Sequence, residues 1–214
     1  MQALIEFLPS LAAGFGTTLL ISIPAFALAV VVGTFAGIFR VSGIKPLMIV
    51  GGLYVALVRN SPLLLILLII VFGLPEAGIL FSLNTSVIIG LGLYSGTYVC
   101  ETVRSGINGV PNGLIEAARA TGLRTVGVLT EVILPLSLRA MVPPLVTIFI
   151  STVLASSLGA AVGVTELTGA TRSFNLIAAQ PIIAFAVAAF GYLVINLTIG
   201  RLGELIERKV RVTK

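Results

Sequence analysis

Long intervals without a charged side chain are the dominant feature of this 214-residue sequence. Four of them lie between successive charged residues, at 7–39, 77–100, 140–165 and 173–200. Each is longer than the roughly 20 residues that a helix needs to span the hydrocarbon core of a bilayer. Only 10% of the residues are charged, against about 25% in soluble domains. We therefore expect an all-α integral membrane protein.

A fifth apolar stretch, 46–75, is interrupted only by Arg59. The part that follows Arg59 would extend about 24 Å as a helix, which is less than the roughly 30 Å thickness of the core. We therefore expect this span to begin before Arg59. Five transmembrane helices, forming one domain over 1–214, would place the two termini on opposite sides of the membrane.

Positive charges indicate the direction of insertion. With the N-terminus outside, only Arg172 would lie outside, and Arg59 is left uncounted within its span. The other Lys and Arg residues would all face the cytoplasm: Arg40, Lys45, Arg104, Arg119, Arg124, Arg139, Arg201, Arg208, Lys209, Arg211 and Lys214. Because cytoplasmic segments carry an excess of Lys and Arg, we expect an outside N-terminus and a cytoplasmic C-terminus. The same rule accounts for the net charge of +5 without a nucleic-acid partner.

The residue types that are missing exclude several kinds of site. The sequence contains no His, no Asp and no Trp, and Cys100 is its single cysteine. A His/Asp/Cys metal cluster and a Ser-His-Asp triad therefore cannot be assembled. We expect no catalytic residue, no metal site and no cofactor bound by this chain.

One long connection, 101–139, is predicted to lie in the cytoplasm between the third and fourth spans. Pro111 and Gly113 break the chain before a short helix that we predict at 114–121. Gly122 is placed to end that helix in a left-handed conformation.

A second short helix is predicted at 125–134, with Pro135 marking the next turn. Two short helices on a cytoplasmic connection are typical of an element that docks a partner. A solvated loop at the membrane surface would show the same pattern, so both interpretations stay open at this point.

This connection resembles the EAA loop of the permease subunits of ATP-binding-cassette importers. That motif reads Glu-Ala-Ala, three residues, Gly, nine residues, and Ile-x-Leu-Pro. The residues that occupy its fixed positions are Glu116, Ala117, Ala118, Gly122, Val132, Leu134 and Pro135. Val132 stands where the family usually has Ile.

Other segments are similar to the polar amino-acid uptake branch of these MetI-like permeases. They read Arg-Asn-Ser-Pro at 59–62, Glu-Thr-Val-Arg-Ser-Gly-Ile at 101–107 and Gly-Val-Thr-Glu-Leu at 163–167. Within that branch the chain looks closest to glutamate-type permease subunits of actinobacteria. It departs from the branch at Leu154 and Ala155, where Lys followed by Asn or Asp is common.

The resemblance implies the membrane-spanning subunit of an ATP-driven importer for polar amino acids of the glutamate or glutamine type, in a bacterial plasma membrane. It implies three kinds of partner: ATPase subunits that hold ATP and Mg, a second permease chain, and an extracytoplasmic solute-binding protein. In this family the EAA loop fits into a groove on the ATPase. The sequence agrees with a separate ATPase, because a P-loop needs Gly-Lys and the chain has no such pair.

The candidates for the substrate path are polar residues in or beside the predicted spans: Arg59, Asn60, Ser156, Ser157 and Glu166. Arg59 could attract an amino-acid carboxylate, or it could anchor a kink before Pro62. The two serines could bind a solute or bond back to the preceding helical turn. Glu166 could gate the outer mouth, bind an amine, or be a simple interfacial charge.

The alternative function is an ATP-independent channel or secondary carrier for a small polar solute, and a membrane scaffold is a third possibility. Proton-coupled carriers use buried ionisable residues as relays, and such residues are sparse in these spans. Secondary carriers are also often built from inverted repeats, and we find no convincing repeat. The spacing of the EAA loop favours the importer.

Overall fold

The computed structural model describes residues 2–210, and every regular element within that range is helical. The α-helices are α1 (Gln2–Val41), α2 (Lys45–Arg59), α3 (Leu63–Leu68), α4 (Leu74–Glu76), α5 (Leu83–Asn108), α6 (Asn112–Ala120), α7 (Thr125–Gly127), α8 (Leu134–Ala155), α9 (Leu167–Ala178) and α10 (Pro181–Val210). Two π-helical segments, η1 (Ile69–Gly73) and η2 (Val128–Ile133), and one 3₁₀-helix, η3 (Ser156–Val162), connect some of them. The predicted all-α fold is confirmed for this part of the chain.

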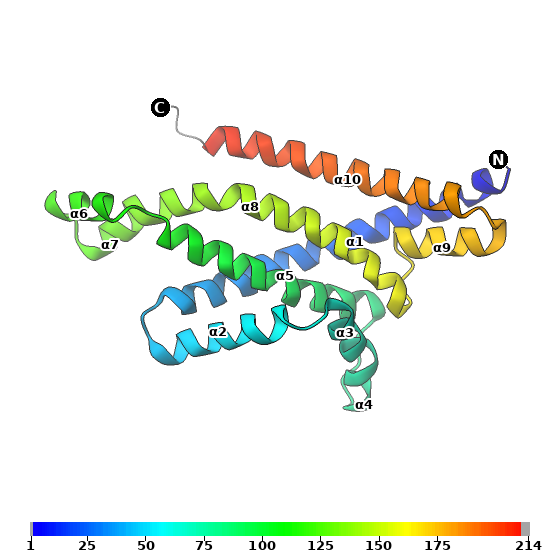
Figure 1. The fold of residues 1–214 in the computed structure, drawn as a ribbon, viewed down its shortest axis with the longest axis horizontal. Coiled ribbons are helices and arrows are strands. Elements are labelled where there is room, and N and C mark those ends of the chain that lie inside the picture. The colour runs from blue at the N-terminus through cyan, green and yellow to red at the C-terminus, as the bar shows by residue number, and fades with distance from the viewer. Residues whose placement is uncertain (1, 211–214) are drawn as a thin grey trace.

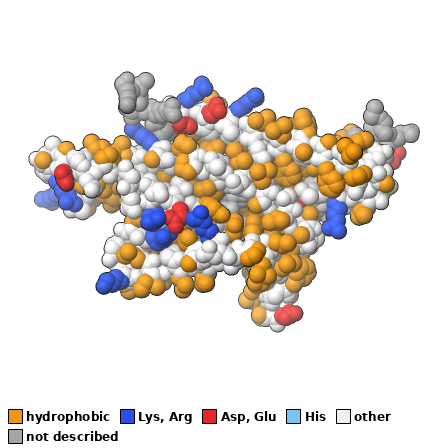
Figure 2. Space-filling view, viewed as in Figure 1, with side chains coloured by type: hydrophobic (Ala, Val, Ile, Leu, Met, Phe, Trp, Pro, Cys, Tyr) orange, Lys and Arg blue, Asp and Glu red, His pale blue; other side chains and the backbone are white. Residues whose placement is uncertain are grey.

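The long helices α1, α5, α8 and α10 run along the long axis of the molecule (Figure 1). The α6 and α7 helices lie at one end of that axis, whereas α9 and the N-terminus lie at the other. The α3 and α4 helices project to one side. Hydrophobic side chains cover much of the visible surface (Figure 2), as expected for helices that contact lipid.

Glycines bring α1 and α5 into direct backbone contact. A Cβ atom on Gly33 would lie 2.5 Å from the Gly96 carbonyl oxygen, and one on Gly37 would lie 2.7 Å from the Val103 Cβ. Small residues allow transmembrane helices to approach this closely, and van der Waals packing then holds them together. Gly33 and Gly37 are four residues apart and therefore lie on the same face of α1, the face that meets α5.

Three helical stretches are long and apolar enough to cross a membrane: Glu6–Val41, Thr125–Val162 and Pro181–Lys209. The pair Lys45–Arg59 and Leu63–Glu76 makes a fourth if it is counted as one span. The α5 helix has 26 residues, and at 1.5 Å per residue it is about 39 Å long, but it is less apolar than these. The five spans and the orientation of the termini stay predictions, and Arg211 and Lys214 lie outside the described residues.

The apolar stretch 46–75 is not the continuous span that the sequence predicts. Its two halves meet at a bend of 99°. Pro62 lacks an N–H group and cannot continue the helix that ends at Arg59. The Asn60 and Ser61 side chains donate to the Ala56 and Leu57 carbonyls, each at 2.8 Å. These carbonyl groups at the end of α2 therefore have hydrogen-bond partners where the chain turns.

Both π-helical segments directly precede a Leu-Pro pair. The η1 segment ends before Leu74-Pro75, and η2 ends before Leu134-Pro135. A proline inside a helix clashes with the carbonyl four residues earlier, and a widened turn relieves that clash. The expectation of a turn at Pro135 is therefore wrong, because one helical stretch runs from Thr125 to Val162.

Two boundaries predicted from the sequence differ from those in the structure. The connection predicted at 101–139 is mostly helical, because α5 continues to Asn108 and the chain is helical again from Thr125. The apolar interval 173–200 is divided by Ala179, which adopts a left-handed conformation (φ +51°) after α9. The last long helix then begins at Pro181, where proline is tolerated because a first-turn N–H needs no helical partner.

The contact between α1 and α5 predicts a large effect of Gly33→Val. The added side chain would meet the α5 backbone and Val99, and overpacking of this kind costs about 1–3 kcal/mol. We expect a clearly lower midpoint of thermal unfolding in detergent. Gly16→Val, in the same helix, is the control, because nothing lies within 4 Å of its added Cβ. Equal midpoints for the two variants would contradict the close contact.

Candidate functional site

The α6 helix and η2 pack against each other at one end of the molecule (Figure 1). We call the segment 109–133, which contains both, the α6 hairpin. Within it Glu116 and Ala117 are exposed, whereas Ala118 is buried. The predicted helix at 114–121 is thus present and turns one alanine inward and a carboxylate outward.

Gly122 ends α6 as the sequence predicts. Its φ of +88° lies in the left-handed region, where residues with a side chain are strained. Its N–H donates to the Arg119 carbonyl at 3.0 Å, and the next N–H, of Leu123, donates to the Ala118 carbonyl at 3.3 Å. Nothing lies within 4 Å of an added Cβ. The backbone conformation alone therefore restricts which residue types can occupy this position.

The remaining EAA positions lie on the helix that returns from the hairpin. Val132 is half-buried in η2, Leu134 is 47% exposed, and Pro135 begins α8 with it. The structure also places exposed apolar side chains on the hairpin that the sequence analysis missed: Leu114, Val126 and Leu129. Apolar residues at the exposed tip of a connection are the signal that could have identified them.

Two adjoining hollows lie between α5 and α8, and polar side chains line both. The first has a volume of about 500 Å³, and the second about 360 Å³. They share Tyr98, Thr147 and Ile148. The first also contains Arg59 and Glu101, and hydroxyl groups from both helices line the second: Tyr94, Ser95, Thr147 and Ser151.

Arg59 reaches the first hollow from the end of α2. Its guanidinium carbon lies 4.8 Å from the centre of the Tyr98 ring, a cation–π contact. The Tyr98 hydroxyl lies 3.3 Å from that of Tyr94. The side chain is otherwise exposed, so its N–H groups can donate hydrogen bonds to a further partner. Arg59 is also the last residue of α2, directly before the 99° bend, so contact with a solute and anchoring of that bend both stay predictions.

Glu101 on α5 pairs with two arginines, Arg40 of α1 and Arg104 of α5 itself. Arg40 donates from Nη1 to Glu101 Oε1, and Arg104 donates from Nε to Oε2 at 3.0 Å. Two positive charges therefore more than balance the one carboxylate that lines the first hollow. With Arg59 added, the electrostatic environment of this hollow is positive.

The other predicted path residues make bonds within their own segments. Ser156 and Ser157 donate to the carbonyls of Val153 and Leu154, each at 2.7 Å. Asn60 bonds back to α2, as described above. The residues that line the two hollows do not include these three, and a role for them in solute transfer stays a prediction.

Glu166 is fully buried and caps the N-terminus of α9. Its carboxylate accepts from the Thr168 and Gly169 N–H groups, each at 2.9 Å, and from the Tyr192 hydroxyl at 2.6 Å. Burial raises the pKa of this carboxyl, and the hydrogen bonds oppose that effect. These contacts tie α9 to α10, and the sequence motif alone does not indicate them.

No group of three or more His, Cys, Asp or Glu side chains that could hold a metal ion occurs among residues 2–210. The guanidinium and hydroxyl groups that line the two hollows can bind a polar solute through hydrogen bonds and charge.

The family model described as "Binding-protein-dependent transport system inner membrane component" matches residues 29–212. The chain belongs to this family. The predicted kinship with amino-acid permeases of ABC importers is confirmed, as is a multi-pass location in the bacterial inner membrane. The permease relatives are transport subunits and not enzymes.

Three relatives are similar to this chain over most of its length. It is 39% identical to the "Probable amino-acid ABC transporter permease protein YckA" of Bacillus subtilis, over 76% of this chain and 72% of that one. It is 32% identical to the "Probable glutamine ABC transporter permease protein GlnM" of the same organism, over 92% and 91%. It is 33% identical to the "Glutamate transport system permease protein GluC" of Corynebacterium glutamicum, over 94% of each.

Solved structures show the same fold. An amino acid ABC transporter crystallised with histidines contains a chain that superposes with a TM-score of 0.90 at 29% identity, over 97% of both chains. The MetNI methionine ABC transporter in an inward-facing form superposes with a TM-score of 0.71 at 22% identity, which shows the fold alone.

The cap at Glu166 predicts a loss of stability in Glu166→Ala. This change removes a buried N-cap and one partner of the Tyr192 hydroxyl, which together contribute about 2 kcal/mol or more. We expect a lower midpoint of thermal unfolding in detergent, with Glu166→Gln intermediate because its amide oxygen still accepts. Glu76→Ala, at an exposed position, is the control, and an equal effect of the two alanine variants would argue against the cap.

Proposed function

We propose that this permease is the membrane-spanning subunit of an ATP-driven importer for polar amino acids of the glutamate or glutamine type. The observation that carries the proposal is the positive polar hollow between α5 and α8, in a molecule whose surface is largely apolar. The relatives named for glutamine and glutamate transport support the same substrate class.

Arg59 is the residue that we assign to the substrate. A guanidinium group binds a carboxylate through two parallel hydrogen bonds, and the Tyr98 ring holds the guanidinium at the edge of the hollow. Because Arg40 and Arg104 already engage Glu101, that carboxylate does not cancel the charge of Arg59. The hydroxyl groups of the second hollow can bind the polar side chain of the solute.

The α6 hairpin is the element that we assign to a separate ATPase. It exposes Glu116 and also the apolar side chains of Leu114 and Val126, and exposed apolar side chains on a connection favour contact with a protein. The two other expected partners are a second permease chain and an extracytoplasmic solute-binding protein. ATP and Mg would be held by the ATPase.

The continuity of the chain suggests how movement would reach the solute. The α6 helix packs on η2, and η2 continues without a break into α8. The α8 helix in turn lines both hollows through Thr147 and Ile148. A displacement of α6 by the ATPase would therefore move one wall of the path relative to α5.

Gly122 provides the test of the coupling role. Gly122→Val strains the left-handed backbone by about 1–2 kcal/mol, and we expect it to weaken capture of the ATPase and reduce ATP-driven uptake. Gly122→Asn is the matched control, since asparagine tolerates this conformation and nothing crowds the position. The measurement is co-purification with the ATPase in detergent, followed by uptake in proteoliposomes. Normal capture of the ATPase and normal ATP-driven uptake in the valine variant would contradict the assignment of α6 to the interface with the ATPase.

Arg59 provides the test of the substrate class. In Arg59→Gln we expect uptake of glutamate at limiting concentration to fall about tenfold or more, because a charge-assisted hydrogen bond to a carboxylate contributes about 1.5–3 kcal/mol. Tyr98→Phe is the control, because the phenyl ring preserves the cation–π contact and should retain most uptake. Uptake that continues without ATP would instead favour a channel or secondary carrier.

A further inference from the structure

A wholly apolar groove lies between α1, α8 and α10, separate from the polar hollows. Its volume is about 380 Å³, within the range of roughly 300–1,000 Å³ that ligand sites occupy. Every side chain that lines it is apolar, and Gly203 completes the lining. Nothing in the proposed path or in the α6 hairpin uses this groove.

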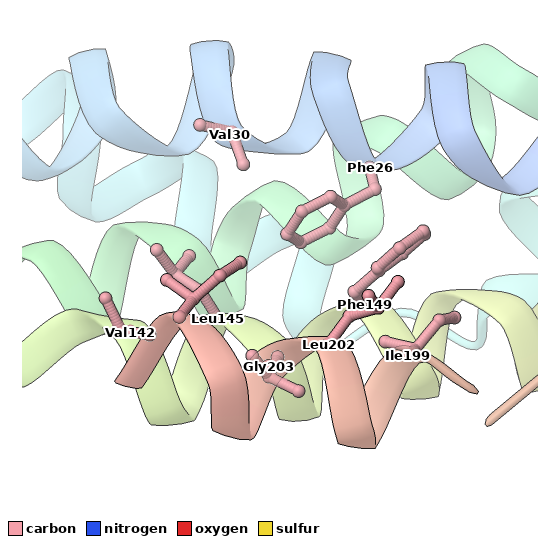
Figure 3. A pocket seen from close by; sticks show the side chains of 10 residues that line it. Phe26, Val30, Val142, Leu145, Phe149, Ile199, Leu202 and Gly203 are labelled. Carbon is pink, nitrogen blue, oxygen red and sulfur yellow. The ribbon is translucent and has the colours of Figure 1, made fainter. Parts of the chain in front are cut away.

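We call the end of the groove at Phe26 and Phe149 its closed end and the end at Val142 its open end (Figure 3). The Phe26 and Phe149 rings stack at one end, with their centres 4.6 Å apart (Figure 3). Val142 lies toward the other end of the view. Along one side, α10 is held against α8 because Gly203 has no Cβ, and a Cβ there would lie 2.6 Å from Val146.

Basic side chains continue the two helix faces that line the groove. On α8, Arg139 lies one turn before Val142, and on α10, Lys209 lies one turn after Ile206. Residues three apart share a helix face, so both cations are at the same end as Val142. Both are exposed. Glu207 is the acidic residue nearest to this end of α10.

The geometry points to a site for one anionic phospholipid: we propose that an acyl chain occupies the groove and that the phosphate contacts Arg139 and Lys209. Inside a membrane an apolar groove gains no preference for one lipid over another from its walls, because all lipid tails are apolar. Selectivity for an anionic lipid would come from the two cations, as in other basic clusters at helix ends. The stacked phenylalanines would limit how far the chain enters.

The absence of tryptophan from the sequence makes a direct test possible. Phe149→Trp places a single fluorophore at the closed end and keeps an aromatic ring against Phe26. The variant is reconstituted in phosphatidylcholine vesicles that contain a small fraction of phosphatidylglycerol with brominated chains. We expect this lipid to quench the tryptophan at least threefold more than brominated phosphatidylcholine at the same mole fraction, a modest part of what two cations can supply.

Matched charge variants identify the headgroup contact. Arg139→Gln with Lys209→Gln should abolish the difference between the two brominated lipids. Arg201→Gln with Arg208→Gln also removes two positive charges. Both of these arginines lie on the face of α10 that is opposite the groove, since successive helical residues turn by about 100°. In this control we expect the difference in quenching between the two brominated lipids to remain. Phe190→Trp, at an exposed position on α10, should report the smaller preference of the bulk lipid around the protein.

Three results would overturn the proposal. Equal quenching by the two lipids would mean that the groove admits any acyl chain. Absence of quenching by either lipid would mean that protein, such as a second permease chain, covers the groove. Loss of the difference in the Arg201 and Arg208 control would mean that overall charge, and not this site, attracts the lipid. Circular dichroism verifies the fold, and Ile206→Trp at the open end replaces Phe149→Trp if that variant misfolds.

Discussion

The close packing of α1 against α5 is the contact on which the rest of this permease depends. Gly33 and Gly37 bring the two backbones together, and the Arg40–Glu101 ion pair joins the same helices farther along. Once α5 is held in this way, it presents Tyr94, Ser95 and Tyr98 toward α8. The polar hollows therefore depend on the packing of one face of α5 against α1, which leaves the face with these side chains toward α8.

The charged residues Glu166, Glu101 and Arg59 have different environments in the structure. Glu166 is buried and satisfied by a helix N-terminus and a tyrosine, so it contributes to the fold. Glu101 is shared between two arginines and leaves Arg59 as the cation that faces the first hollow. Arg59 and Glu166, which are equal candidates for the substrate path in the sequence, thus have different environments, because one lines a polar hollow and the other is buried as a helix cap.

Local signals predicted local structure well. The α6 helix and the left-handed Gly122 follow from proline, glycine and good helix formers within a few residues, and both are present. The 99° bend after Arg59 and the burial of Glu166 could not be predicted in the same way. The bend depends on where the chain can pack once Pro62 ends the helix, and the cap depends on Tyr192, which is distant in sequence. The hollows likewise depend on α5 and α8 meeting, which periodicity alone does not indicate.

The η2 segment has a consequence for the geometry between α6 and α8. A π-helical turn holds one residue more than an α-helical turn, so η2 absorbs an extra residue without changing the helices on either side. Each residue rotates a helix by about 100°. Because the widened turn takes up that residue, removal of one residue from η2 would leave an α-helical turn and keep the facing of the α6 hairpin around the axis of α8. Removal of one residue from a purely α-helical part of α8 would instead rotate the hairpin by that angle.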